Sequence, residues 1–229
     1  MKFRRKSDPV DGADASGVAD SGSPDVGDDA DGRGESGPYD VDDLPEDGIE
    51  RVDLGSLLIE PQPGRELRLQ VDEASGQVQA VVLAGSDGAV ELRAFAAPRN
   101  GDLWSEVRPQ IAADMAQRGG VATEREGRFG TELTCQLTVQ RADGGTGTQP
   151  SRIIGINGPR WMLRATLLGR PAMDFEGSQS WEDTIGKVAV RRGPGAMPVG
   201  EPLDVVLPPG ARRQTVPDAA PTDSPPDSA

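Results

Sequence analysis

The chain has 229 residues, of which 35% are hydrophobic, and it carries a formal net charge of −14 at pH 7. It contains no histidine and one cysteine. These counts exclude serine–histidine and cysteine–histidine nucleophiles, the commonest zinc and iron ligand, iron–sulfur clusters, thiolate zinc sites and an internal disulfide. We therefore expect no metal and no cofactor, and catalysis is a less favoured hypothesis than binding.

The negative charge lies in the two ends of the chain. Residues 1–50 hold 15 acidic and 5 basic residues, a net charge of −10, whereas residues 51–200 hold 18 and 17, a net charge of −1. The ends also lack large apolar side chains, so they cannot bury enough surface to offset the entropy of ordering. We predict a disordered acidic tail at 1–48, a single domain at 49–207 and a disordered proline-rich tail at 208–229.

Apolar and polar residues alternate through the first part of the predicted domain. The alternation predicts an antiparallel meander of three strands joined by tight turns, at 66–71, 77–83 and 89–96. A helix is expected from Asp102 to Arg118, with Asp102 as the N-cap and Gly119-Gly120 as the stop. Pro109 lies inside that helix, and we expect it to cause a kink or a late start.

The second part of the domain again alternates, with the clearest period at 131–140. A hairpin is expected from strands at 152–156 and 160–168, joined by a turn at Asn157-Gly158. A helix capped by Ser180 should follow at 180–190, and a short extended segment at 203–207. Hairpins with two inserted helices predict an α+β fold, with an antiparallel sheet covered on one face or partly on both.

Several residues could be either core or functional side chains. Cys135 falls on the apolar side of its strand, so we interpret it as a buried, unreactive thiol. Core packing is likewise the favoured interpretation for the three tryptophans, Trp104, Trp161 and Trp181.

Arginine is the residue that offers binding chemistry. Arg68, Arg93, Arg160 and Arg164 fall on the polar faces of predicted strands. A solvated face with cross-strand ion pairs is the favoured interpretation, and a groove that binds anions or carboxylates is the alternative. Polar groups cluster near an aromatic residue at two places, which makes the candidate binding residues Arg99, Asn100, Arg160, Trp161 and Arg164.

The segment from about Gly37 to Gly193 resembles a family of actinobacterial proteins known only as domain of unknown function 3710. The resemblance rests on strings such as Arg51-Val52-Asp53-Leu54-Gly55-Ser56-Leu57, Leu92-Arg93-Ala94-Phe95-Ala96-Ala97-Pro98-Arg99 and Gly158-Pro159-Arg160-Trp161. It implies a cytoplasmic protein and assigns no catalytic residue. The element order also resembles the antiparallel sandwiches of the Mog1 and PsbP type, which serve as binding or assembly factors; this is an analogy of fold alone.

The leading hypothesis is a soluble, cytoplasmic, non-catalytic module that binds a protein partner or acts as a scaffold. The alternative is a protein, even an enzyme, that binds a small molecule or anion on an arginine-lined sheet face. A near-neutral domain beside acidic ends argues against nucleic acid. The basic residues at 2–6 are too few for us to expect stable membrane association, and the sequence leaves the oligomeric state open.

Overall fold

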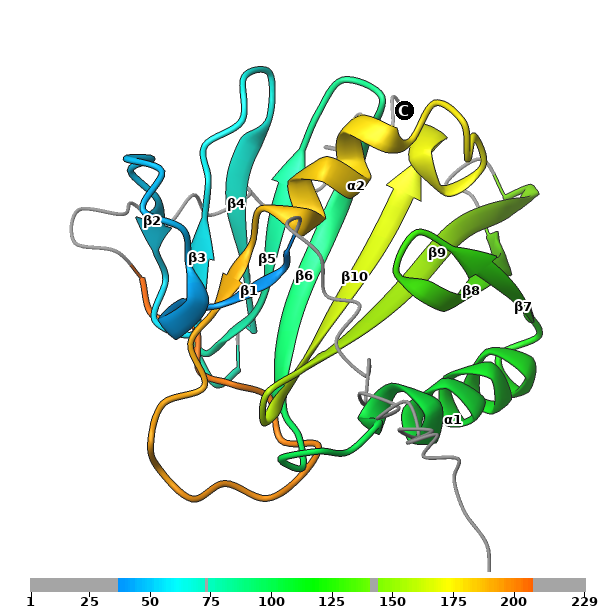
Figure 1. Cartoon of the computed structure of the whole chain (residues 1–229). Coiled ribbons are helices and arrows are strands. Elements are labelled where there is room, and N and C mark those ends of the chain that lie inside the picture. The colour runs from blue at the N-terminus through cyan, green and yellow to red at the C-terminus, as the bar shows by residue number, and fades with distance from the viewer. Residues whose placement is uncertain (1–36, 73, 141–143, 208–229) are drawn as a thin grey trace, which may run out of the picture. The chain divides into compact units, whose positions relative to one another are not determined.

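The computed structural model describes residues 37–72, 74–140 and 144–207 (Figure 1). Within these residues, seven strands form an antiparallel sheet in the order β4-β5-β6-β10-β9-β8-β7. These strands are β4 (Glu66–Val71), β5 (Val78–Ala84), β6 (Gly88–Ala96), β7 (Val121–Gly127), β8 (Gly130–Gln140), β9 (Thr146–Gly158) and β10 (Trp161–Gly169). The described residues contain no helix that is long and apolar enough to cross a membrane.

A second, smaller sheet is built from very short strands in the order β1-β11-β3-β2. Its members are β1 (Tyr39–Asp40), β2 (Val52–Asp53), β3 (Leu57–Ile59) and β11 (Ala189–Val190). The β1–β11 pair is parallel, and the other pairs are antiparallel. Two 3-10 turns, Val41–Asp43 and Arg170–Ala172, complete the regular structure together with the two helices, α1 (Leu103–Gln117) and α2 (Gln179–Gly186).

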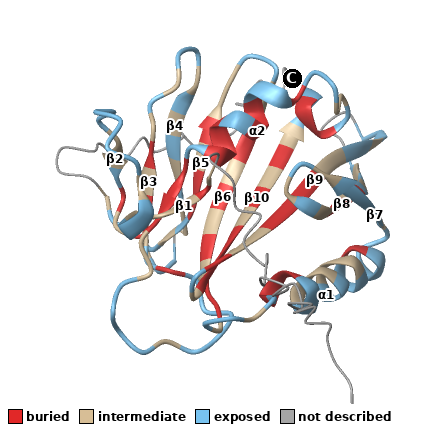
Figure 2. Cartoon of the chain, in the orientation of Figure 1, coloured by how far each residue is buried: buried red, intermediate tan, exposed pale blue. Residues whose placement is uncertain are grey.

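The large sheet is covered on both faces. On one face, α2 and the small sheet pack over its central strands and enclose the main core, which includes Trp161, Leu163 and Trp181 (Figures 1 and 2). On the other face, α1 packs against β8, β9 and β10 through a second core that includes Trp104, Leu133 and Met162. Because adjacent residues of a strand point to opposite faces, Trp161 and Met162 belong to different cores.

The α+β fold class, the meander and the first helix are confirmed. Asp102 caps α1, since its carboxylate accepts a hydrogen bond from the Ser105 backbone N–H at 3.0 Å. Of the two effects expected of Pro109, the late start is wrong, because the helix begins at Leu103 and includes Pro109, and the kink stays a prediction. The hairpin is confirmed, but its turn lies at Pro159-Arg160 rather than at Asn157-Gly158, since β9 extends to Gly158.

Two further predictions differ from the structure. Ser178, not Ser180, is the N-cap of α2, and the helix ends at Gly186 before the chain enters β11. The domain also extends further toward the N-terminus than the predicted boundary at residue 49. Asp40 in β1 accepts a hydrogen bond from the buried Trp161 indole N–H at 2.8 Å, which ties this segment to the core. The rest of the predicted tails, 1–36 and 208–229, lies outside the described residues.

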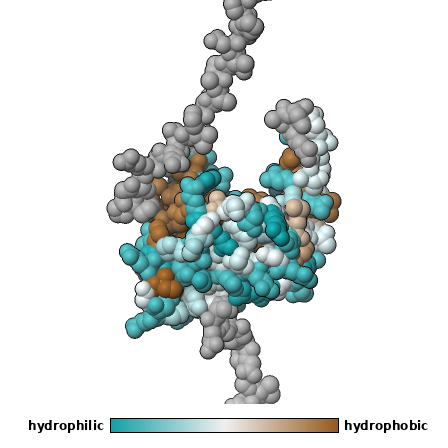
Figure 3. Space-filling view, turned by 90° about the horizontal axis from the view of Figure 1, so that it is seen from above, coloured by the Kyte–Doolittle hydropathy of each residue, from teal (hydrophilic) through white to brown (hydrophobic). Residues whose placement is uncertain are grey.

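Exposed hydrophobic side chains are spread along the chain. The large ones with the greatest exposure are Ile49, Val121, Met173, Val199 and Val206. Figure 3 shows a face that is mostly hydrophilic, with hydrophobic colour in separate patches.

Cys135 lies in the second core, as the alternation of β8 predicts. Its side chain is 2% exposed, and burial raises the pKa of its thiol. Since the thiolate is the reactive form, we expect a thiol reagent to modify the folded protein far more slowly than the unfolded protein. Mass spectrometry with and without urea measures both rates, and rapid stoichiometric labelling of the folded protein would contradict the burial.

Candidate functional site

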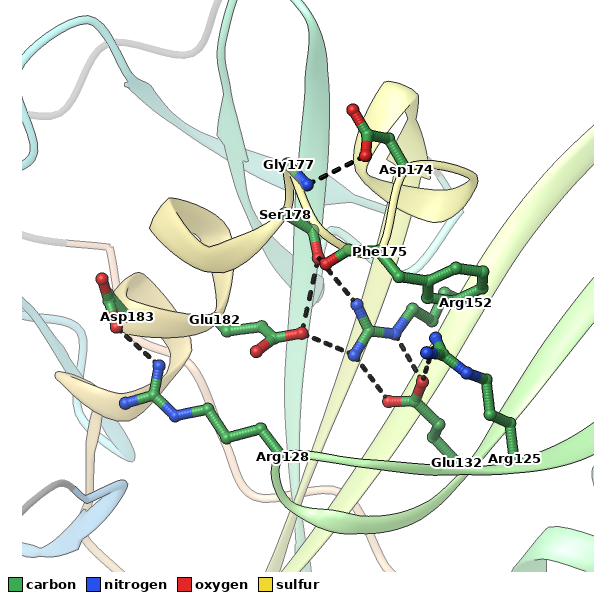
Figure 4. Close-up of polar contacts among 10 residues, drawn as sticks. All are labelled: Arg125, Arg128, Glu132, Arg152, Asp174, Phe175, Gly177, Ser178, Glu182 and Asp183. Carbon is green, nitrogen blue, oxygen red and sulfur yellow. Dashed lines mark hydrogen bonds and ion pairs between the residues drawn. The ribbon is translucent and has the colours of Figure 1, made fainter.

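A buried ion network joins β8, β9 and α2 (Figure 4). The guanidinium of Arg152 donates to both carboxylate oxygens of Glu132, at 2.7 and 2.8 Å, and to Glu182 at 2.6 Å. It also donates to the Ser178 hydroxyl at 2.9 Å. All four residues are buried, and Glu132 and Ser178 have no exposed surface at all. The network therefore lies inside the main core, under α2.

The network is saturated by its own members. Burial alone would lower the pKa of Arg152, but the hydrogen bonds to Glu132 and Glu182 outweigh that effect and raise it. Arg125 adds a second positive charge 3.8 Å from Glu132 and stacks on Phe175, with 3.6 Å from its guanidinium carbon to the ring centroid. With donors and acceptors matched, the network has little capacity for a ligand, so we interpret it as a structural link.

Arginines of a second kind lie along the β6–β10 pair and in the loops at one of its ends. In the described part of the chain, Arg93, Arg99, Arg160 and Arg164 form no salt bridge and donate no side-chain hydrogen bond. Arg93 lies on β6, Arg99 follows it, Arg160 lies in the β9–β10 turn and Arg164 lies on β10. We call these four residues the arginine end. Most other described arginines pair with a carboxylate, as Arg118 does with Asp114 and Arg170 with Asp174.

Two members of the arginine end are direct neighbours across the sheet. Arg164 of β10 is the register partner of Arg93 on β6, and both side chains are partly buried. Both guanidiniums lie over the ring of Phe95, with carbon-to-centroid distances of 5.7 Å for Arg93 and 5.2 Å for Arg164. Burial and, after it, the charge of Arg93 lower the pKa of Arg164, while the charge of Glu91 opposes this.

Helix α1 bounds this pair on one side. Arg164 faces Gly155 of β9 on its other flank, and a Cβ atom built on Gly155 would lie 2.1 Å from the ring of Trp104. Glycine at this position therefore lets the indole of α1 lie directly on the sheet. The Trp104 indole N–H donates to the Thr131 carbonyl at 2.6 Å, which holds the ring in place beside Arg164.

The loops at the same end of the sheet are tied together. The Ala97 N–H donates to the Arg160 carbonyl at 2.9 Å, which joins the turn to the loop that carries Arg99 and Asn100. Arg160 adopts a φ of 63°, a backbone conformation that is uncommon for residues other than glycine. Asn157 donates its amide to Asp102 at 2.6 Å, so the end of β9 also meets the start of α1.

Asp102 is electrostatically adapted to that position. Burial would raise its pKa, but hydrogen bonds from the Ser105 side chain and backbone and from Asn157 outweigh burial and lower it. The carboxylate is therefore ionised at neutral pH, and it already accepts hydrogen bonds from Ser105 of α1 and from Asn157 of β9.

Of the five predicted binding residues, Arg99, Asn100 and Arg160 lie in loops at one end of the β6–β10 pair, and Arg164 lies in the fourth row from that end. The fifth, Trp161, lies on the opposite face and is 1% exposed, so it belongs to the main core. Sequence reasoning placed Arg93 on a polar strand face but left it out of the candidate residues. The alternation of residues along β6 indicated that Arg93 lies on the polar face. It could not indicate which residue of β10 lies opposite Arg93.

Other places on the surface offer less. An open hollow of about 540 Å³ at the β4–β5 hairpin is lined by Gly64, Arg65, Glu66, Arg68, Ala84 and Gly85. Its two arginines are already engaged, Arg68 with Glu66 at 2.6 Å and Arg65 stacked 3.9 Å from the Trp181 ring centroid. Among the residues that the structure describes, no group of three or more cysteine, aspartate or glutamate side chains could hold a metal ion.

Comparison with known proteins gives a family. A model described as "Protein of unknown function (DUF3710)" matches residues 37–214. The chain belongs to this family. No curated protein matches the chain.

One similar solved structure is the cyanobacterial PsbP (CyanoP) from Synechocystis sp. PCC 6803, determined in solution. It is 11% identical, with a TM-score of 0.36, over 62% of this chain and 92% of that chain. At a TM-score this low, the similarity supports no conclusion about the function of this family member.

Proposed function

We propose that this DUF3710 domain is a binding module that holds an acidic segment of a partner protein at the arginine end. One observation carries the proposal: within the described residues, four arginines without a carboxylate partner gather on two neighbouring strands and their adjoining loops. Guanidinium groups bind carboxylates through paired, charge-assisted hydrogen bonds, so such a cluster suits acidic side chains.

The layout favours an extended ligand over a compact one. Arg93 and Arg99 are six residues apart in the sequence. The three steps along β6 from Arg93 to its end at Ala96 alone span roughly 10 Å, so separate acidic groups suit the two residues better than one small anion. A polypeptide with several aspartate or glutamate side chains could meet them together.

The test is binding of a short fluorescent peptide of alternating glutamate and glycine, followed by anisotropy at low ionic strength. We expect the Arg99→Ala/Arg160→Ala variant to bind about tenfold more weakly, since two surface ion pairs contribute up to roughly 1 kcal/mol each. The Arg118→Ala/Arg170→Ala variant removes the same charge from paired sites and should bind like the wild type. Equal losses in the two double variants, or no binding by the wild-type protein, would contradict the proposal.

A further inference from the structure

The sheet places two like charges in an unfavourable position. Arg93 and Arg164 are directly opposite each other on β6 and β10. Directly opposite residues have Cβ atoms about 5 Å apart, and like charges there destabilise the strand pair. Both guanidiniums also lie over the ring of Phe95, so the two side chains stay close to each other. An anion between them would turn this repulsion into attraction.

The polar atoms around the pair are not matched within the protein. The Nε of Arg93 is buried and has no hydrogen-bond acceptor among the groups that the structure describes. Glu91 is close enough to favour the charged form of Arg164, yet it accepts no hydrogen bond from either arginine in the described residues. The buried Arg152 shows the contrast, because both oxygens of Glu132 accept from its guanidinium.

Two aromatic residues lie next to the arginine pair. Trp104 lies over Gly155, the residue of β9 that is opposite Arg164. Phe95 lies two residues after Arg93 on the same face of β6, and it forms an isolated β-bridge with Pro202. One small oxyanion suits two neighbouring guanidiniums, because guanidinium forks match the oxygens of carboxylate and phosphate groups.

We propose that Arg93 and Arg164 form a two-guanidinium anchor for a single oxyanion, a carboxylate or a phosphate. This inference rests on the proposed function, in which the anchor holds one acidic group of the bound segment. Arg99 and Arg160 then contact its neighbours.

The experiment titrates the full chain with sodium acetate and, separately, with sodium phosphate, at an ionic strength kept constant with chloride. The arginine side-chain Nε–Hε signals are followed by NMR and assigned from the Arg93→Lys and Arg164→Lys variants. We expect the two assigned signals to shift together and saturably. Because lysine keeps the charge but loses the fork, each variant should bind about tenfold more weakly. The Arg118→Lys variant should bind like the wild type.

The two titrations separate the sources of the oxyanion. Saturation by acetate identifies a carboxylate anchor, and saturation by phosphate alone identifies a phosphate anchor; either result supports the inference. Unchanged Arg93 and Arg164 signals in both titrations would overturn it, as would lysine variants that bind as tightly as the wild type. Loss of peptide binding in Arg99→Ala/Arg160→Ala without any effect of the lysine variants would overturn the anchor and leave the proposed function intact.

Discussion

Replacing Arg152 with methionine is expected to lower the free energy of unfolding by about 3–5 kcal/mol, because the change leaves two buried carboxylates without their partner. Glu132 has no exposed surface, and Glu182 is 8% exposed, so water cannot replace the lost hydrogen bonds. Within the described residues, Arg125 would be the cation still paired with Glu132, at 3.8 Å. The deficit should shrink in acidic solution, since protonation removes the unpaired negative charges.

Urea denaturation at neutral and acidic pH measures the effect. The control is Arg170→Met, which breaks the exposed pair with Asp174 and should cost less than about 1 kcal/mol. A triple variant, Arg152→Met/Glu132→Leu/Glu182→Leu, removes all the charges and should recover most of the lost stability. If the triple variant is no more stable than Arg152→Met, lost packing rather than unpaired charge explains the deficit.

The large sheet could be predicted because its strands are long enough to show a period. In Gly88–Ala96, four alternate residues from Val90 to Ala96 are buried, and this pattern was readable from the sequence. The strands of the small sheet have two or three residues, too few for any period. They form because Tyr39–Asp40 and Ala189–Val190 meet in space, which depends on contacts across 150 residues of chain.

The candidate site could be predicted in part for the same reason. Alternation placed Arg164 and Arg93 on a polar face, and the structure makes them cross-strand partners. Which arginines find a carboxylate is a tertiary property that local pattern does not carry. Arg152 looked like any strand arginine, yet its partners Glu132 and Glu182 lie 20 and 30 residues away.

Replacing Gly155 with alanine is expected to destabilise the protein by at least about 2 kcal/mol, because the new methyl group would overlap the indole of Trp104. Its Cβ would lie 2.1 Å from the ring, closer than any real contact allows. The ring cannot turn away freely, since Trp104 is 4% exposed and its N–H is bonded to the Thr131 carbonyl. The strain must therefore be relieved by moving α1 away from β9.

Urea denaturation again measures the change, with Gly195→Ala as the control. Gly195 is exposed, and a methyl group added there would meet no atom within 4 Å, so its substitution should change stability by less than about 0.5 kcal/mol. Because Trp104 lies over the residue opposite Arg164, the Gly155→Ala variant should also bind oxyanions more weakly even under conditions where it stays folded. A Gly155→Ala protein as stable as the Gly195→Ala protein would mean that α1 does not rest on β9 through this indole.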